Sequence, residues 1–197
     1  MSRIVDMLRG MRVAVAHPPD QERDALVGQL RRIGCEAHVL WPAPREAPMG
    51  ADVVFVSLDQ HADPARTWAM AEDGPTIIAV VEYENPLMLK ALLDSAAHGV
   101  VVKPLRPFGI LSTLVLARSQ HGYNRRMDAK VRKLEDTLKA HRDVAKAARI
   151  LADLKAIPES QAYEMIRAQA TRRRIAMAQV ACAIISAQDV LKDLSGD

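Results

Sequence analysis

Four apolar runs in this sequence end at residues that a reaction site could use. The four residues are His17, Ser57, Val81 and Lys103. A serine at the end of a buried strand offers one neutral oxygen, and the sequence supplies no base to activate it. A magnesium ion needs several hard oxygen ligands, and a valine offers none. These residue types therefore predict no nucleophile–base pair, no metal site and no enzyme at the strand ends.

A second group of candidate residues is basic and lies near the C-terminus. Arg167, Thr171 and Arg174 are spaced by four and three residues, so on a helix they share one face. Tyr163 stands four residues before Arg167 on that face. Cations that bind phosphates and side chains that contact bases suit a nucleic-acid interface. Two alternatives remain open: core packing explains Tyr163 equally well, and the arginines can form a solvated surface.

The first 120 residues alternate strand-like and helix-like segments. Five β-rich runs are predicted to be strands, at residues 11–17, 35–41, 51–59, 75–83 and 100–105. Helical segments are predicted at residues 22–34, 64–73, 84–99 and 107–120. This alternation favours an α/β fold with a five-stranded parallel sheet and helices on both faces. We predict a doubly wound, flavodoxin-like domain over residues 1–120, whose strand ends bring the four residues named first together.

After residue 120 the sequence predicts helices alone. The apolar positions of residues 121–156 alternate by four and three, which is typical of a coiled coil. These seam positions are Met127, Val131, Leu134, Leu138, His141, Ala145, Ala148 and Ala152. The helix pairs either with a second copy or with the rest of this chain. We favour a homodimer through residues 121–146, using the seam from Met127 to Ala145, because charged residues flank it.

The remaining residues, 147–195, are predicted to form a small all-α domain. Pro158 stands where a new helix begins, and one continuous helix is expected over residues 159–187. Its expected buried side contains Ala162, Met165, Ile166 and Ala170.

Composition narrows the class of protein. The chain has 197 residues and a net charge of +3, with the whole basic excess after residue 120, so an anionic partner is plausible for that part. Cys35 and Cys182 lie far apart, without a zinc or disulfide pattern, and are expected to be small core residues. The histidines are scattered, and no cofactor is expected. No signal peptide or apolar run of about 20 residues occurs, so we expect a cytoplasmic protein without membrane contact.

The first domain resembles the receiver domain of bacterial response regulators. In that family the first strand ends in acidic residues that hold magnesium, the third in a phosphate-accepting aspartate and the fourth in Ser or Thr. Here His17 and Pro18 stand at the acidic positions, Ser57 at the acceptor position, and Val80 or Val81 at the hydroxyl position.

Only the final receiver element, Lys103–Pro104, is retained. The resemblance therefore implies a degenerate receiver that is not phosphorylated by the usual route. Asp20 or Asp59 could substitute for the missing carboxylates. For Lys103 we expect pairing with a local backbone carbonyl.

The tail resembles the ANTAR family of RNA-binding transcription antiterminators. The matching stretches are "AARILA" at residues 147–152, "PESQAYEMIRAQATRRR" at 158–174, and "AQVACAII" after them. The order of receiver-like domain, coiled coil and ANTAR tail is similar to that of the AmiR-like regulators. Shorter stretches agree with this family: "RIGC", "WPAP", "DVVFVS", "VEYENP" and "HGVVVKP".

This resemblance implies that the tail binds hairpins in leader mRNA and thereby prevents termination. The residues expected to contact RNA are Arg149, Tyr163, Arg167, Thr171, Arg172, Arg173 and Arg174. One departure concerns the family's "AKG", which reads "AAR" here. Either Arg149 replaces the lysine from one position along, or the affinity is reduced.

The AmiR-like family also implies a mode of control. A ligand-sensing negative regulator of periplasmic-binding-protein-like fold would sequester the chain, in place of phosphorylation. The main alternative function is a DNA-binding response regulator with a helix-turn-helix-like output domain, because residues 154–174 could imitate such a motif.

Overall fold

The computed structural model describes residues 8–58, 68, 74–82 and 86–195. The chain divides into two compact units, Met1–Arg125 and Arg126–Asp197, each described by itself below. The finer division at residues 120 and 146 stays a prediction. The strands are β1 (Arg12–Ala16), β2 (Glu36–Val39), β3 (Val53–Ser57), β4 (Thr76–Val81) and β5 (Gly99–Val102). The helices are α2 (Gln21–Ile33), α4 (Pro86–Asp94), α5 (Pro107–Lys155), α6 (Glu159–Arg173) and α7 (Met177–Ser195).

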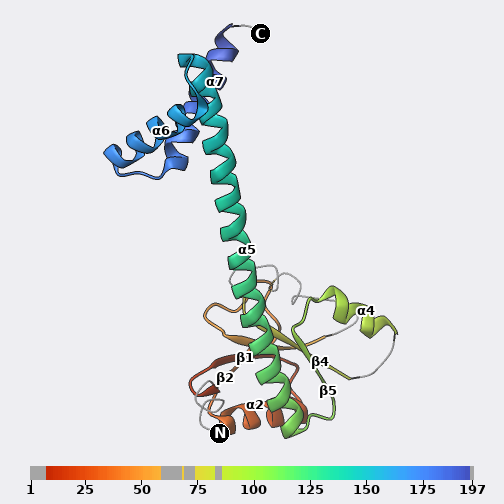
Figure 1. Cartoon of the computed structure of the whole chain (residues 1–197). Coiled ribbons are helices and arrows are strands. Elements are labelled where there is room, and N and C mark those ends of the chain that lie inside the picture. The colour runs from red at the N-terminus through yellow and green to blue at the C-terminus, as the bar shows by residue number, and fades with distance from the viewer. Residues whose placement is uncertain (1–7, 59–67, 69–73, 83–85, 196–197) are drawn as a thin grey trace. The chain divides into compact units, whose positions relative to one another are not determined.

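The five strands form one parallel sheet in the order β2-β1-β3-β4-β5 (Figure 1). This is the flavodoxin-like strand order, so the predicted fold class is confirmed. The register pairs Ser57 with Val80 and Val81 with Val102. Apart from Trp68, the predicted helix over residues 64–73 lies outside the described residues.

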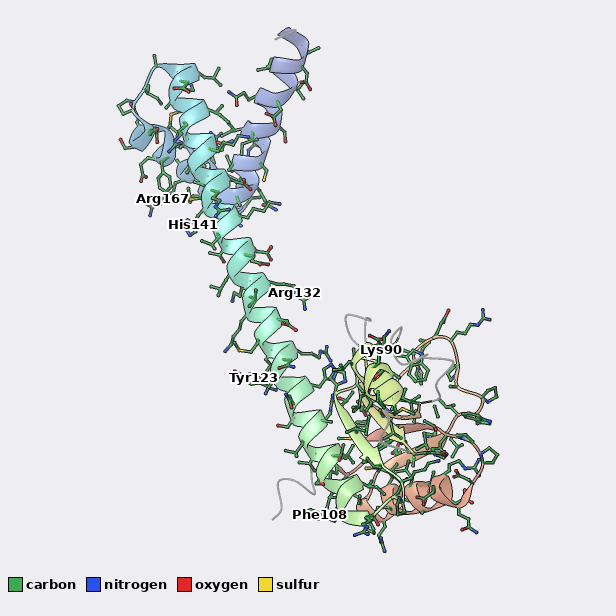
Figure 2. The ribbon with its side chains drawn as sticks, turned by 90° about the vertical axis from the view of Figure 1, so that its right-hand side faces the viewer. Lys90, Phe108, Tyr123, Arg132, His141 and Arg167 are labelled. Carbon is green, nitrogen blue, oxygen red and sulfur yellow. The ribbon has the colours of Figure 1, made fainter. Side chains whose placement is uncertain are left out.

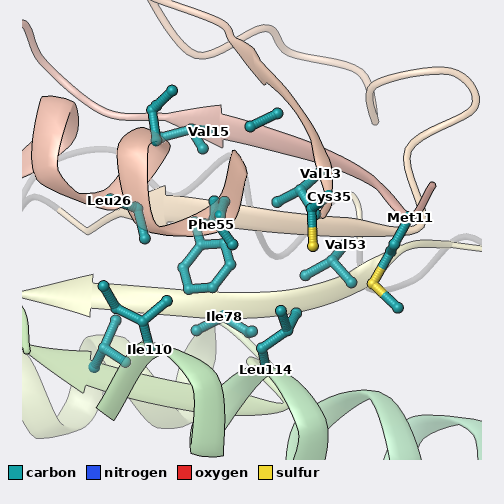
Figure 3. Packing of buried hydrophobic residues seen from close by; sticks show 14 of the residues in the cluster. Met11, Val13, Val15, Leu26, Cys35, Val53, Phe55, Ile78, Ile110 and Leu114 are labelled. Atoms are coloured by element: carbon teal, nitrogen blue, oxygen red, sulfur yellow. The ribbon is translucent and has the colours of Figure 1, made fainter. Parts of the chain in front are cut away.

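Strand alternation gives the sheet two apolar faces, because successive side chains point to opposite sides. On one face Phe55 and Ile78 pack with Leu26 of α2 and with Ile110 and Leu114 of α5 (Figure 3). The other face packs against Trp68 and α4 through a second set of buried residues, which are Ala14, Ala16, Val54, Val56, Ile77, Ala79 and Val81. Both faces are needed to bury the nearly continuous apolar strands β3 and β4.

Helix α2 shows how local sequence fixes an element near the strand ends. Its N-cap is Asp20, whose Oδ1 accepts a hydrogen bond of 2.7 Å from the Arg23 amide. Its C-cap is Gly34, with φ 102°, a left-handed conformation that glycine adopts without strain. The cap therefore holds the Asp20 carboxylate at the carboxyl end of β1, beside the candidate site.

In the second unit, the end of α5 packs with α6 and α7 around a core made largely of alanine. The buried residues are Val144, Ala147, Ala148, Ala152, Ala162, Ile166, Ala170, Val180 and Ala181. Small side chains let the helices approach closely. The prediction that Met165 is buried is wrong, because 39% of it is exposed.

The predicted single helix over residues 159–187 is also wrong. The chain bends by 116° between α6 and α7. Arg174 adopts the left-handed conformation with φ 55°, and its amide donates to the Ala170 and Thr171 carbonyls, which ends α6 as a glycine would. Because of this bend, Val180 and Ala181 reach the same core as Ile166.

Two further expectations concern the burial of the cysteines and the absence of a membrane-spanning segment. Cys35 is buried as predicted, whereas Cys182 is exposed, so its assignment to the core is wrong. Within the described part of the chain, no single helix is both long and apolar enough to cross a membrane. The bent pair of α6 with Met177–Leu191 passes that test only jointly, by length and composition.

Candidate functional site

At the carboxyl ends of the strands, charged side chains pair with one another. Lys103 follows β5, and its Nζ lies 2.8 Å from Glu82 Oε1 and 3.4 Å from Asp20 Oδ2. Only 13% of the Lys103 side chain is exposed. The expected backbone-carbonyl partner for Lys103 is therefore wrong. Its partners are the carboxylates of Glu82, which follows β4, and Asp20, the N-cap of α2, and neither was among the expected site residues that end a strand.

The pKa values of this cluster reflect the pairing. Burial by itself would raise the pKa of Asp20, but the Arg23 amide, His17 and Lys103 together hold it below its usual value. Burial would lower the pKa of Lys103, and the contacts with Glu82 and Asp20 instead raise it above its usual value. Both groups are therefore charged over the ordinary pH range, and each neutralises the other.

The remaining strand-end residues offer little further chemistry. His17 is fully buried, and its Nδ1 lies 2.9 Å from the Pro18 carbonyl and 3.4 Å from Asp20 Oδ1. Ser57 is half-buried, and Val81 is buried. Within the described residues no group of three or more His, Cys, Asp or Glu side chains could hold a metal ion. Asp59, the second substitute carboxylate, lies outside the described residues.

A contact that the sequence does not signal joins two histidines of the same unit. The centroids of the His98 and His121 rings lie 4.0 Å apart, and His121 Nδ1 is 2.8 Å from the Thr76 hydroxyl oxygen. Burial, with His98, Arg125 and Arg118 nearby, lowers the pKa of His121 to about 4. The sequence presents these histidines as scattered because they are far apart along the chain.

The basic candidates in the second unit are exposed, and Figure 2 shows Arg167 among them. Arg149 Nε lies 3.5 Å from Glu159 Oε1, and Arg167 lies 3.6 Å from Glu164. Arg172 donates to the Gln169 side chain at 2.7 Å. Pairs this exposed contribute little to stability. The guanidinium groups therefore remain accessible to an anionic partner.

Two of the expected RNA contacts also have local roles in α6. Arg174 lies beyond the last residue of α6 and is its C-cap, in the left-handed conformation. The Thr171 hydroxyl donates to the Arg167 carbonyl at 3.0 Å, so only its lone pairs are left for a ligand. Tyr163 is 42% exposed and lines a cleft, which does not fit a fully packed core residue.

The seam of α5 is exposed over the residues expected to dimerise. The exposed fractions are 39% for Met127, 48% for Val131, 64% for Leu134 and 57% for Leu138, and His141 and Ala145 are exposed as well. Ala148 and Ala152, the last two positions of the seam, lie in the core shared with α6 and α7, so at this end the helix pairs with the rest of its own chain. The exposed apolar stripe therefore ends where the helical core begins.

Comparison with known proteins matches both units. A family model described as "AmiR, N-terminal" matches residues 11–118, and the ANTAR domain model matches residues 132–185. The chain is 31% identical over 181 residues to the aliphatic amidase regulator of Pseudomonas aeruginosa, covering 90% of this chain and 92% of that protein. This chain belongs to the AmiR family. The expected resemblance of this chain to AmiR-like regulators with an ANTAR tail is thereby confirmed.

Solved structures with similarity to the AmiR-family chain include two receiver proteins. The ChxR receiver domain of Chlamydia trachomatis is 15% identical, with a TM-score of 0.44, and the match covers 57% of this chain and 99% of the ChxR chain. The chemotaxis response regulator CheY4 of Vibrio cholerae is 16% identical, with a TM-score of 0.44, and covers 55% and 98%.

Proposed function

We propose that this AmiR-family chain is a positive regulator that acts by transcription antitermination, binding hairpins in leader mRNA through its ANTAR domain. The observation that carries this proposal is the group of exposed arginines on α6 and at its end, within the stretch that matches the ANTAR model. Such cations neutralise phosphates, and half or more of the polar contacts to a nucleic acid go to its backbone.

The proposed RNA contacts are those of the arginine group and its neighbours. They are Arg149, Tyr163, Arg167, Thr171, Arg172, Arg173 and Arg174. Sequence-specific proteins usually read RNA in loops, where bases are unstacked. A stabilised hairpin would exclude the competing terminator from the transcript, so the protein needs affinity and no covalent chemistry.

Two protein partners complete the proposal. The exposed apolar stripe of α5 supports a homodimer through Met127, Val131, Leu134 and Leu138. Two ANTAR domains on one dimer would bind two hairpins with a gain in effective concentration. Control is assigned to sequestration by a ligand-sensing protein of periplasmic-binding-protein-like fold, because Ser57 stands where receivers carry the acceptor aspartate and the nearby Asp20 carboxylate is paired with Lys103.

One observation favours a second candidate, DNA binding. Helices α6 and α7 meet at 116° across a short turn, within the range of a helix-turn-helix. In this helix pair α7 would be the recognition helix, not α6 as in the motif expected over residues 154–174, and α7 from Met177 to Ser195 carries a single lysine and two aspartates. A helix with so few cations is poorly suited to the major groove.

A gel-shift titration at fixed salt tests the proposal. The full chain would be titrated on a two-hairpin leader RNA, on the same RNA with scrambled loops, and on duplex DNA of that region. We expect tight binding only where the loops are intact. Equal, salt-sensitive binding to all three would reduce the arginines to a charge patch, and preference for the duplex would favour DNA binding.

A further inference from the structure

The second unit, called the helical unit below, contains a cleft that none of the exposed arginines lines. It has a volume of about 420 Å³ and lies between α5, Tyr163 of α6 and the turn into α7. Its apolar lining consists of three alanines, at 140, 176 and 178, together with Val144 and Met177. This volume falls in the range of small-ligand clefts.

The polar groups on the cleft wall are available to a ligand. Lys133, Asp136, Thr137 and His141 of α5 line the same cleft as Tyr163. The Thr137 hydroxyl donates to the Lys133 carbonyl at 2.8 Å, which leaves its lone pairs as acceptors. Among the residues that the structure describes, the side chains of Lys133, Asp136, His141 and Tyr163 have no hydrogen-bond or ion-pair partner.

The cleft is not the dimer seam. Successive residues of a helix are separated by about 100° around its axis. The wall residues Thr137, Ala140 and Val144 therefore lie roughly 100° from the face of Leu134 and Leu138. Only His141 belongs to both sets, at their border, so helix pairing through the seam leaves the wall itself uncovered.

We propose that this cleft holds one unpaired base of an RNA hairpin loop, stacked on the Tyr163 ring. The inference rests on the proposed RNA binding and adds the position where a base is read. An aromatic ring beside a cationic surface is the usual platform for an unstacked base. Arg167 follows Tyr163 by one helical turn and would contact the phosphates of the same nucleotide stretch.

The wall chemistry also selects among the bases. The Asp136 carboxylate only accepts hydrogen bonds, and it matches the exocyclic amino group of adenine, cytosine or guanine. Uracil presents two carbonyl acceptors and a single N–H between them, and its carbonyls would face the carboxylate. The cleft therefore disfavours uracil at the loop position that it holds.

The first experiment uses the full chain and a pool of RNA hairpins with one fixed stem and a randomised loop. After selection, hairpins carrying each of the four bases at the enriched loop position are titrated at fixed salt. We expect uracil to be depleted there, and its hairpin to bind roughly 5- to 150-fold more weakly than the best one. Asp136→Asn, which adds a donor, should remove most of that difference.

Variants of the ring complete the test. Tyr163→Ala should weaken binding of the best hairpin roughly 5- to 150-fold, the range measured for removing a stacked base partner. Tyr163→Phe keeps the ring and should bind within a factor of two to three of the unchanged chain. Met165→Ala removes an exposed apolar side chain of the same helix outside the cleft, and it should change neither affinity nor loop preference.

The outcomes separate the cleft from the wider function. If the unchanged chain binds no hairpin, both proposals fail. If it binds with loop preference and Arg172→Ala weakens binding, while Tyr163→Ala and Asp136→Asn keep affinity and base preference, the cleft inference alone is overturned. A change of oligomeric state in Tyr163→Ala, with RNA binding unchanged, would make the cleft a protein contact and would also overturn it.

Discussion

The two units of this chain treat their charges in opposite ways. At the strand ends of the first unit, Lys103 is paired with Glu82 and Asp20 and is mostly shielded from water. In the helical unit, Arg167 and Arg149 have one exposed local carboxylate each. The first unit thus closes its polar site internally, whereas the basic helices leave theirs open. Binding chemistry is therefore to be sought in the helical unit.

The largest expected effect tests whether the helical unit depends on its small alanine-rich core. Ile166 is 1% exposed and is one of the few large side chains there. Ile166→Ala should lower the free energy of unfolding by about 2–5 kcal/mol. The change removes buried apolar atoms, whose transfer out of water stabilises the fold, and it leaves a cavity in their place. Urea denaturation followed by circular dichroism measures this. Met165→Ala, one residue away and 39% exposed, should lower it by less than about 0.5 kcal/mol.

The next effect probes the closed charges of the first unit. Lys103→Met leaves the Asp20 and Glu82 carboxylates facing each other without a cation. We expect a loss of about 1–2 kcal/mol in unfolding free energy, reduced by the partial exposure of both carboxylates. Lys130→Met on the exposed part of α5 is the matched change in the other unit, and equal losses for the two would break the contrast between the units.

A pH dependence of stability is expected in the first unit. The pKa of folded His121 is about 4, against an ordinary value of 6.5, because burial and nearby positive charge disfavour its protonation. The unfolded chain therefore binds the proton first, so stability is full above pH 6.5 and falls as pH drops toward 4.

Replacing His121 locates this dependence. His121→Gln keeps an acceptor for the Thr76 hydroxyl and should reduce the loss of stability between pH 6.5 and 4, whereas the part that comes from His98, whose pKa burial also lowers, should remain. Thermal denaturation at a series of pH values is the measurement, and an unaltered slope in His121→Gln would rule out this origin.

The smallest change in stability should accompany a clear change in binding. Arg173 is exposed at the end of α6. Arg173→Ala should alter the unfolding free energy by less than about 0.5 kcal/mol. If Arg173 contacts a phosphate, the salt dependence of hairpin binding should lose about one unit of slope. An unchanged slope would remove this arginine from the proposed interface.

Periodicity predicts the sheet well because each strand is a local apolar run whose burial the fold requires. Such local patterns predict the five strands and helix α2, which begins after Asp20 and ends at Gly34. The pairing of Lys103 with Glu82 and Asp20 could not be predicted in this way, because it joins three chain segments that only the tertiary fold brings together.

The helical unit was harder to predict for a different reason. The break at Arg174 carries no glycine or proline, so the apolar spacing continues through it as if one helix persisted. The sequence also does not indicate where the seam ends, because alanine suits both a coiled coil and a close contact between helices of one chain. Which alanines of α5 enter the core of their own chain therefore depends on α6 and α7, whose direction the break at Arg174 decides.

Arg174 has a consequence for anyone who engineers this protein. Its left-handed backbone costs an ordinary residue about 1–2 kcal/mol, and glycine would adopt the same φ of 55° freely. A library screened for heat resistance alone would therefore favour glycine at this position and discard a guanidinium group from the proposed RNA interface. Thermostable variants of this chain should accordingly be screened for binding in the same round, since improvement in one property conceals loss of the other.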